Sequence, residues 1–351
     1  MCKLSLILCS RNDEYMGNSR WRLQTTLNYV ADHVESLGRE KDVEVLVADW
    51  GSEIPLQDVL QLTPAATKIT SFVLIPPDIA RPLQKDSPFA EVLALNAAAR
   101  RAKGAYVGRI DQDTLVGRRF LELFFDLHEG RQKLEVPLDR ALLFSNVRMV
   151  PYRFVVRSPS LWAVKCFLVK FGRRMKIEIT SAREFYWYSV GIWLVSRNIW
   201  HACGGYDEEM LYMNGMEINM IYRLLPKYPM VNLGEMTDCD FYHLEHYHPF
   251  VPRMSSVYRK ENSQWRLDFN PNGADWGLAQ YSLTIAPSRS IAALTPHSER
   301  DQDAHHELRF RFLVLLVGLQ VACDSLVLKG LRAARSLHRF RSLWWHRIGV
   351  G

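Results

Sequence analysis

Residues 103–113 read KGAYVGRIDQD, and the fold class that we predict for the chain follows from this stretch. A helix-like run ends at Lys103-Gly104, and a short β-type run then stops at two aspartates one residue apart. Residues i and i+2 of a strand point to the same face, so Asp111 and Asp113 project together if the strand reaches them. A divalent cation such as Mg²⁺ would relieve the repulsion between two such carboxylates. The same residue types are common in turns, so the pattern alone leaves both interpretations open.

The residues before this stretch alternate between strand-like and helix-like patterns. Apolar runs predict strands at 4–9, 43–48 and 70–75, and helical spacing predicts helices at 21–37, 56–62 and 89–103. This alternation favours an α/β fold with a parallel sheet. Ligands of such sheets bind beyond the carboxyl ends of the strands. Polar residues follow three of the predicted strands, and we expect them to lie close together: Ser10, Arg11, Asp49, Asp111 and Asp113.

The composition is that of a globular protein with a sizeable core. The chain has 351 residues, 48% of them hydrophobic, and a formal net charge of +6. That charge suits an anionic substrate or a membrane surface but is too small to indicate nucleic acid. The six cysteines form no C-x-x-C pair, so we expect mostly free thiols in a reducing compartment. We see neither a secretory signal nor 18 consecutive apolar residues, and we expect a cytoplasmic protein.

Motifs for two common nucleotide-binding classes are missing from the sequence. No G-x-G-x-x-G follows the first predicted strand, and no P-loop occurs anywhere. A dinucleotide-dependent oxidoreductase and a P-loop NTPase are therefore disfavoured.

The second half of the chain is less regular. Residues 130–185 are rich in arginine and lysine with interleaved aromatic residues. We interpret them as a solvated face on an irregular insert, or alternatively as a surface for an anionic acceptor or a lipid head group. Residues 189–196 are typical of a strand, and 216–225 of a helix that ends at Pro226.

Three histidines lie within six positions: His243, His246 and His248. Imidazole is a frequent metal ligand, so this cluster indicates a metal site. A structural or surface cluster of histidines is the alternative.

Several motifs, in this order, resemble nucleotide-sugar-dependent glycosyltransferases of the GT-A fold, in the broad family 2 and galactosyltransferase-like group. They are SRND, VADWGS, LNAAARRAKGAYVGRIDQD, GGYDEEM followed by GME, and HLEH. The resemblance covers roughly residues 3–250. It implies a Rossmann-like, mostly parallel sheet with flanking helices in a catalytic domain at 1–265, with a donor half at about 1–120 and an acceptor half at about 185–250.

The resemblance also implies a site for a nucleotide-sugar donor, in the first place a UDP-sugar. Asp49 would contact the base, and Asp111 with Asp113 would hold the ribose and a diphosphate-bound Mn²⁺ or Mg²⁺. His243 or His246 would complete the metal site. The other donor-binding residues expected are Ser10, Arg11, Asn96 and Arg109.

On the acceptor side, the resemblance places Asp207 and Glu208 in a loop that faces a glycan or lipid-linked acceptor. Glu217 matches the acidic residue that removes a proton from the acceptor hydroxyl, in an inverting transfer. The family often has Glu-Asp there, but Ile218 follows Glu217 in this chain. We therefore assign the catalytic base to Glu217.

Two other functions remain open from the sequence. The same aspartates and metal could serve a nucleotidyl or phosphoryl transferase. The basic tail would suit a non-enzymatic module that binds a membrane or nucleic acid, although we find no nucleic-acid-binding signature and expect no such partner.

The C-terminal third lacks the family's motifs. Residues 266–308 are expected to form an extended segment packed on the core, or a linker. Residues 309–351 predict a basic helical tail, and 309–345 are expected to lie on the inner face of a membrane. A helix packed on the catalytic domain, or an oligomer contact, is the alternative.

Overall fold

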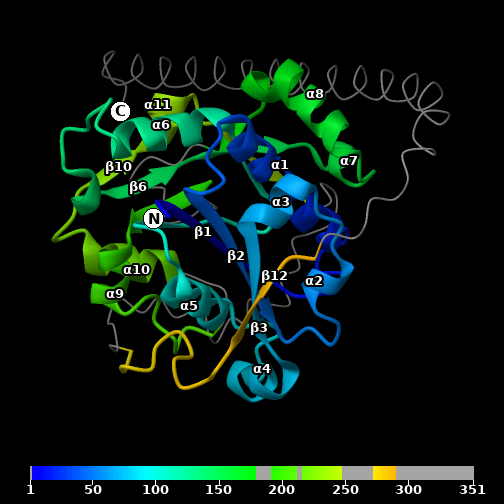
Figure 1. Ribbon diagram of the computed structural model, residues 1–351, viewed down its shortest axis with the longest axis vertical. Coiled ribbons are helices and arrows are strands. Elements are labelled where there is room, and N and C mark those ends of the chain that lie inside the picture. The colour runs from blue at the N-terminus through cyan, green and yellow to red at the C-terminus, as the bar shows by residue number, and fades with distance from the viewer. Residues whose placement is uncertain (1, 179–190, 212–215, 247–271, 290–351) are drawn as a thin grey trace, which may run out of the picture. The chain divides into compact units, whose positions relative to one another are not determined.

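The computed structural model describes residues 2–178, 191–211, 216–246 and 272–289 (Figure 1). The chain divides into two compact units. The first comprises 1–161 and 177–294, and the second comprises 162–176 and 295–351.

An eight-stranded sheet forms the centre of the first unit (Figure 1), with the order β10-β6-β9-β4-β1-β2-β3-β12. β1, β2, β3 and β4 run parallel, as do β6 and β10, while β9 and β12 are antiparallel to their neighbours. The strands are β1 Leu4–Ser10, β2 Val43–Trp50, β3 Thr70–Ile75, β4 Tyr106–Arg109, β6 Leu142–Ser145, β9 Ile192–Ser196, β10 Met230–Asn232 and β12 Thr284–Pro287. The expected α/β class with a mostly parallel sheet is thereby confirmed.

Helices cover both faces of this sheet (Figure 1). They are α1 Ser19–Ser36, α2 Leu56–Val59, α3 Pro64–Ile69, α4 Pro77–Gln84, α5 Glu91–Arg101, α6 Arg118–His128, the 3-10 turn η1 Leu138–Arg140, α7 Tyr152–Val155, α9 Arg197–Cys203, α10 Met216–Leu224 and α11 Leu233–Thr237. Leu6 and Leu8 of β1 pack into a core with α1, α3 and α6, whereas Ile7 packs into a second core with α5, α9 and α10. The strand is apolar on both faces, which explains the near-continuous apolar run in the sequence.

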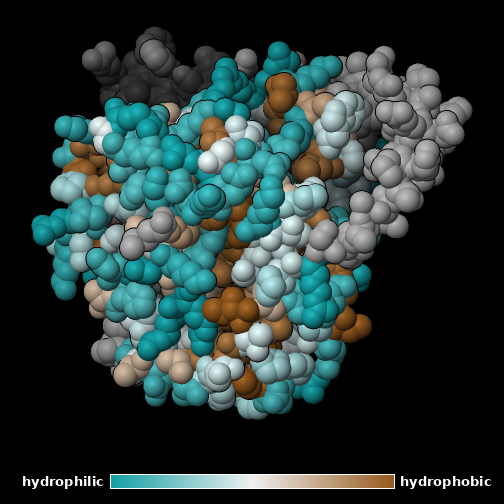
Figure 2. Space-filling view, in the orientation of Figure 1, coloured by the Kyte–Doolittle hydropathy of each residue, from teal (hydrophilic) through white to brown (hydrophobic). Residues whose placement is uncertain are grey.

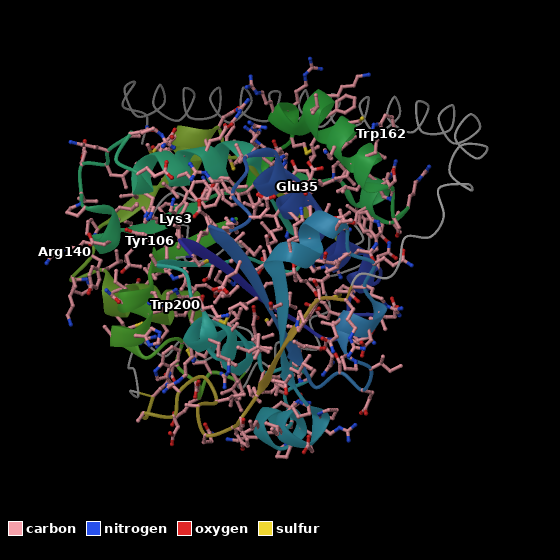
Figure 3. All side chains as sticks on the ribbon, viewed as in Figure 1. Lys3, Glu35, Tyr106, Arg140, Trp162 and Trp200 are labelled. Atoms are coloured by element: carbon pink, nitrogen blue, oxygen red, sulfur yellow. The ribbon has the colours of Figure 1, made fainter. Side chains whose placement is uncertain are left out.

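Trp200 shows how α9 is attached to the sheet (Figure 3). Its side chain is fully buried, and its Nε1 donates a hydrogen bond of 3.2 Å to the carbonyl oxygen of Val107 in β4. Its ring lies 5.3 Å from the ring of Tyr206 in an edge-to-face arrangement.

A second, four-stranded sheet branches from the first. Its order is β5-β11-β7-β8, with β5 Thr114–Val116, β7 Val147–Val150, β8 Ile177–Glu178 and β11 Phe241–Leu244. Four residues, 110–113, connect β4 of the large sheet to β5 of the small one. This turn contains both aspartates of the opening stretch, so its path decides where they point.

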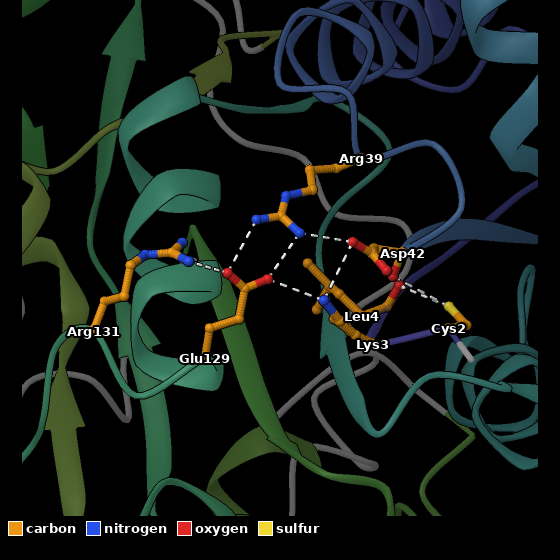
Figure 4. Close-up of polar contacts among 7 residues, drawn as sticks. All are labelled: Cys2, Lys3, Leu4, Arg39, Asp42, Glu129 and Arg131. Atoms are coloured by element: carbon orange, nitrogen blue, oxygen red, sulfur yellow. Dashed lines mark hydrogen bonds and ion pairs between the residues drawn. The ribbon is translucent and has the colours of Figure 1, made fainter.

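An ionic network joins the start of β1 to the ends of α1 and α6 (Figure 4). Lys3 Nζ lies 3.0 Å from Glu129 Oε1 and 3.4 Å from Asp42 Oδ2, and Arg39 contacts the same two carboxylates. Arg131 also pairs with Glu129. Glu129 accepts from all three cations, and these bonds lower its pKa to about 2. The network lies at the amino end of β1, whereas the carboxyl ends of the strands carry the candidate site.

Several local expectations differ from the structure. β4 ends at Arg109, so the strand does not persist to Asp113, and both aspartates lie in the turn. The interpretation of 130–185 as an irregular solvated insert is wrong for 142–150, which form β6 and β7. Arg148 in this stretch is buried, and its Nη2 lies 3.0 Å from Asp238 Oδ1.

The remaining segments add few described elements. In the first unit, 284–287 form edge strand β12, and Trp276 and Leu278 just before it are buried. Two described elements belong to the second unit: helix α8 Leu161–Phe171, whose first residue still belongs to the first unit, and the 3-10 turn η2 Gly172–Arg174. The predicted tail at 309–351 lies outside the described residues. None of the described helices is long and apolar enough to cross a membrane.

Hydrophilic side chains predominate on the face drawn in Figure 2, with smaller apolar areas between them. The five described cysteines, Cys2, Cys9, Cys166, Cys203 and Cys239, are all free thiols, as expected.

Candidate functional site

The order in which the parallel strands are added to the large sheet changes side at β1. From β1 the chain proceeds to β2 and β3 on one side, and β4 then returns to the other side of β1. Such a switch point leaves a crevice at the carboxyl ends of the strands, where α/β proteins bind ligands. Ser10 ends β1, and its Oγ donates a hydrogen bond of 2.5 Å to Gln112 Oε1 in the turn after β4.

Three potential metal ligands meet beside this crevice. Asp113 is 3% exposed; its Oδ1 lies 3.3 Å from His243 Nδ1, and its Oδ2 lies 3.4 Å from His246 Nε2. One ligand atom from each of the three residues lies within 4.8 Å of the others. Three of the four predicted metal ligands are therefore brought together.

The small sheet explains how residues so far apart in sequence meet. His243 in β11 pairs with Thr114 in β5, which follows Asp113 directly. The amide of Leu244 donates to the carbonyl oxygen of Asp113 at 2.9 Å. His246 follows shortly after the end of β11.

Arg22 is a partner of Asp113 that the sequence analysis did not identify. Its guanidinium is fully buried and donates through Nη1 to Asp113 Oδ2. Its Nη2 donates to the carbonyl oxygens of Tyr15 and Gly17, at 2.5 Å and 3.2 Å. No pattern in the sequence of this helix indicates that Arg22 contacts Asp113, which lies 91 residues further along the chain.

The electrostatics of Asp113 favour the charged carboxylate. Burial raises its pKa, but His243, Arg22 and His246 outweigh that effect and hold the pKa below its ordinary value. His243 Nδ1 is buried and makes no hydrogen bond to any described residue. One carboxylate and two imidazoles, with such an orphaned ring nitrogen, fit a divalent cation such as Mn²⁺.

Asp111, the fourth predicted ligand, points elsewhere. Its Oδ1 lies 2.7 Å from Nη2 of Arg109, and the same nitrogen lies 3.0 Å from Glu91 Oε1 and 3.2 Å from Glu217 Oε1. Arg109 thus holds carboxylates from α5, from the turn after β4 and from the start of α10. Sequence reasoning missed Glu91, because nothing in an alanine-rich helix indicates its partner.

This cluster carries more negative than positive charge in a buried place. Burial raises the pKa of Glu91 to about 7, with Arg109 opposing the rise and Glu217 and Asp111 adding to it. Burial likewise raises the pKa of Asp111. The Glu217 side chain keeps 25% of its surface exposed and is therefore the most exposed of the three carboxylates.

A cavity of about 400 Å³ opens near the ends of β1 and β2. Its walls come from the loops after these strands and from α4, namely Arg11, Asn12, Gly51, Ser52, Glu53, Ile54, Ala80, Arg81 and Gln84. Arg11 is also fixed in place, since its Nε donates to Asp13 Oδ2 at 2.8 Å.

Asp49 lies behind the wall of this cavity. It is 2% exposed, and its carboxylate accepts hydrogen bonds from Ser52 Oγ and, at 2.7 Å, from the Leu56 amide. Burial raises its pKa from 3.8 to about 6, although both hydrogen bonds oppose the change.

The structure also brings together three residues for which ligand contacts were predicted: Asn96, Asp207 and Glu208. Asn96 Nδ2 donates to the Tyr206 carbonyl oxygen and to Glu208 Oε1, at 2.9 Å and 3.0 Å. Glu208 also accepts from the Gly277 amide at 2.6 Å. Asp207 is fully buried beside them. These residues fix the loop at 204–208 in place, and their predicted ligand contacts stay predictions.

No family model matches the chain, and no curated protein matches it. Among solved structures, it is similar to S. aureus TarS, with a TM-score of 0.43 and 13% identity over 69% of this chain and 37% of that chain. TarS 1–349 in complex with UDP-GlcNAc gives a TM-score of 0.44 and 15% identity over 73% of this chain and 62% of that chain. The alignments thus span less than two thirds of either TarS chain.

A third similarity is to the catalytic domain of Drosophila beta1,4galactosyltransferase 7 in complex with xylobiose. Its TM-score is 0.38 and its identity 10%, over 70% of this chain and 71% of that chain. All three TM-scores are below 0.5.

Proposed function

We propose that the chain is a metal-dependent glycosyltransferase that moves a sugar from a nucleotide-sugar donor to a hydroxyl group. The observation that carries the proposal is the group Asp113, His243 and His246 beside the switch point, with Glu217 on the neighbouring Arg109 cluster. The motif order supports a sugar donor over a nucleotidyl or phosphoryl substrate.

Asp113, His243 and His246 would hold Mn²⁺ or Mg²⁺. Once bound, the cation would supply positive charge to a departing diphosphate. Arg22 pairs with Asp113 and fixes its orientation, so the carboxylate is ready for the cation without reorganisation. Asp111 pairs with Arg109 and not with the two histidines, so we propose that it contacts the ribose or the sugar and not the cation.

Glu217 would take the proton of the acceptor hydroxyl as that oxygen attacks the sugar. Arg109 fixes the Glu217 carboxylate at 3.2 Å, and Glu91 and Asp111 restrain Arg109 in turn. A base held in one orientation on the opposite side of the sugar from the leaving group would give inversion. A glycan or lipid-linked hydroxyl is the acceptor that we propose.

Thermal unfolding of the full chain with a panel of nucleotide sugars tests donor binding. We expect at least one nucleotide sugar to raise the unfolding temperature in the presence of Mn²⁺ and to do so less after chelation. Stabilisation by none of them, with or without metal, would reject the proposal and favour a non-enzymatic role.

A further inference from the structure

Helix α8 and the 3-10 turn η2 that follows it carry cations and no acids. Residues 162–176, which belong to the second unit, contain five lysines and arginines and no aspartate or glutamate. The segment therefore has a strong positive charge of its own, and such a charge favours an anionic partner.

Buried and exposed side chains follow each other along α8 with the period of an α-helix. Five side chains form its buried face: Ala163, Val164, Phe167, Leu168 and Phe171. The side chains on the opposite side are exposed or half-buried and recur at intervals of three or four residues. We call them the outer face of α8: Trp162, Lys165, Cys166, Val169 and Lys170.

The middle of the outer face is apolar. Trp162 (Figure 3) is 61% exposed, and Val169 is 90% exposed, the largest exposed fraction of any bulky apolar side chain in the described parts of the chain. A helix turns by about 100° per residue, so these two side chains, seven positions apart, point in directions that differ by only about 20°. Bulky apolar side chains that share one exposed direction indicate a surface that contacts a partner.

Lysines border this apolar strip on both sides. By the same helix geometry, Lys165 lies about 60° to one side of Trp162 and Lys170 about 80° to the other. A lysine can lay its hydrocarbon stem along an apolar surface while its ammonium group stays in a polar layer. Three more exposed cations follow the helix: Arg173, Arg174 and Lys176.

We propose that the outer face of α8 lies on the surface of a lipid bilayer that contains anionic lipids. Trp162 and Val169 would enter the boundary between head groups and acyl chains, and the lysines and arginines would reach the lipid phosphates. The helix has 11 residues, whereas about 20 are needed to span a bilayer, so α8 would lie in the plane of the surface.

A soluble polyanion accounts for only part of this pattern. Nucleic acid would pair with the cations through its phosphates, but a row of phosphates offers Val169 no apolar contact. A bilayer surface supplies both an anionic layer and an apolar layer beneath it. The inference concerns residues other than the predicted tail at 309–345, and it does not depend on whether the chain transfers a sugar.

Sedimentation of the full chain with vesicles tests the charged part of the outer face. We expect binding to vesicles of phosphatidylcholine with phosphatidylglycerol and much weaker binding to phosphatidylcholine alone. Lys170→Glu with Arg174→Glu should weaken the binding at least about tenfold. Lys133→Glu with Arg140→Glu makes the same change of net charge on an exposed loop and should change the binding far less, because the Debye length is about 10 Å at 0.1 M salt. Equal binding of the two double variants, or no binding of the unaltered chain, would overturn the inference.

Val169→Asp tests the apolar part of the outer face. We expect it to weaken binding to the same vesicles about tenfold, because it removes an apolar side chain from the interface and adds a negative charge there. Met236→Asp makes the same kind of change at a position that is 40% exposed on α11 and should leave the binding unchanged. Melting curves of both variants check that they are folded. Weaker binding in the charge variant together with unchanged binding in Val169→Asp would contradict contact with a bilayer and favour a soluble polyanion.

Discussion

Asp113 combines two interactions that a single substitution can separate. Its carboxylate faces two imidazoles and also pairs with the fully buried Arg22. Asp113→Ala would leave that guanidinium without its carboxylate, at a cost of roughly 3–5 kcal/mol in the free energy of unfolding. Asp113→Asn also removes the negative charge that attracts a cation, but it keeps an oxygen that accepts a hydrogen bond from Arg22, so it should destabilise the fold less than Asp113→Ala.

We therefore expect Asp113→Asn to fold and to lose the Mn²⁺-dependent part of nucleoside diphosphate binding. Calorimetry with and without Mn²⁺ measures that part, and Asp139→Asn, an exposed aspartate, is the matched control. If metal dependence survives in Asp113→Asn, the cation lies elsewhere.

Asp49 gives a pH dependence with a definite sign. Its pKa in the folded chain is about 6, above the ordinary 3.8, so the folded state binds this proton more tightly than the unfolded state. The resulting stabilisation is complete below the ordinary pKa and is lost as the pH rises through about 6, and it amounts to at most about 3 kcal/mol.

Asp49→Asn has no such proton to lose. The unfolding temperature of the unaltered chain minus that of Asp49→Asn should therefore decrease between about pH 4 and about pH 7. Melting curves at both pH values measure the change, and a constant difference would contradict the assignment of a raised pKa to Asp49.

At the scale of elements, the turn after β4 shows what the sequence could and could not predict. The apolar run of β1 and the position of β3 were correctly predicted, because strands buried on both faces leave a continuous signal. The sequence predicted that Asp111 and Asp113 point to the same side only if the strand continued to Asp113. β4 ends at Arg109, so this condition is not met. Their separate partners, Arg109 and the histidines, come from non-local packing that no local pattern contains.

The same limit explains the elements that were missed. β6 and β7 are four residues each and contain polar positions, so 130–185 appeared irregular. The charge of Arg148 suggested solvent, but its partner Asp238 lies 90 residues further along the chain. His243 and His246 were identified because they are close in sequence, whereas Arg22 and Glu91 contact the site from separate helices.

Gly104 is an element-scale test of how α5 passes into β4. A Cβ atom at this position would lie 2.5 Å from the Ser5 amide nitrogen and 2.8 Å from the Leu4 carbonyl carbon, so backbone would have to move. We expect Gly104→Ala to reduce the free energy of unfolding by about 1–3 kcal/mol. At Gly273 a Cβ would meet nothing within 4 Å, so denaturant titration of Gly273→Ala should show little change. Equal stabilities of the two variants would refute the tight approach at Gly104.

At the scale of the whole molecule, the basic tail predicts membrane attachment. Six Lys and Arg residues and no acid lie between Lys329 and the C-terminus, and Trp344-Trp345 suit an interface. Each cation near an anionic surface contributes about 1 kcal/mol. We expect the full chain to float with anionic vesicles at low salt, and a chain truncated at Glu307 to bind them less. Equal flotation of both chains, or of neither, would exclude the tail as an anchor.

The central claim is metal-dependent sugar transfer with Glu217 as the base. Release of nucleoside diphosphate from a panel of nucleotide sugars measures it, with water standing in for the acceptor. We predict release that requires Mn²⁺ or Mg²⁺, and a fall of about 10²–10⁴-fold in Glu217→Gln. Glu122→Gln should leave release unaffected, because the Glu122 side chain on α6 is 43% exposed and pairs with Arg118. Binding of the diphosphate should persist in Glu217→Gln. Release from no nucleotide sugar would contradict the proposed activity, and a Glu217→Gln rate above about a tenth of the original would contradict the choice of base.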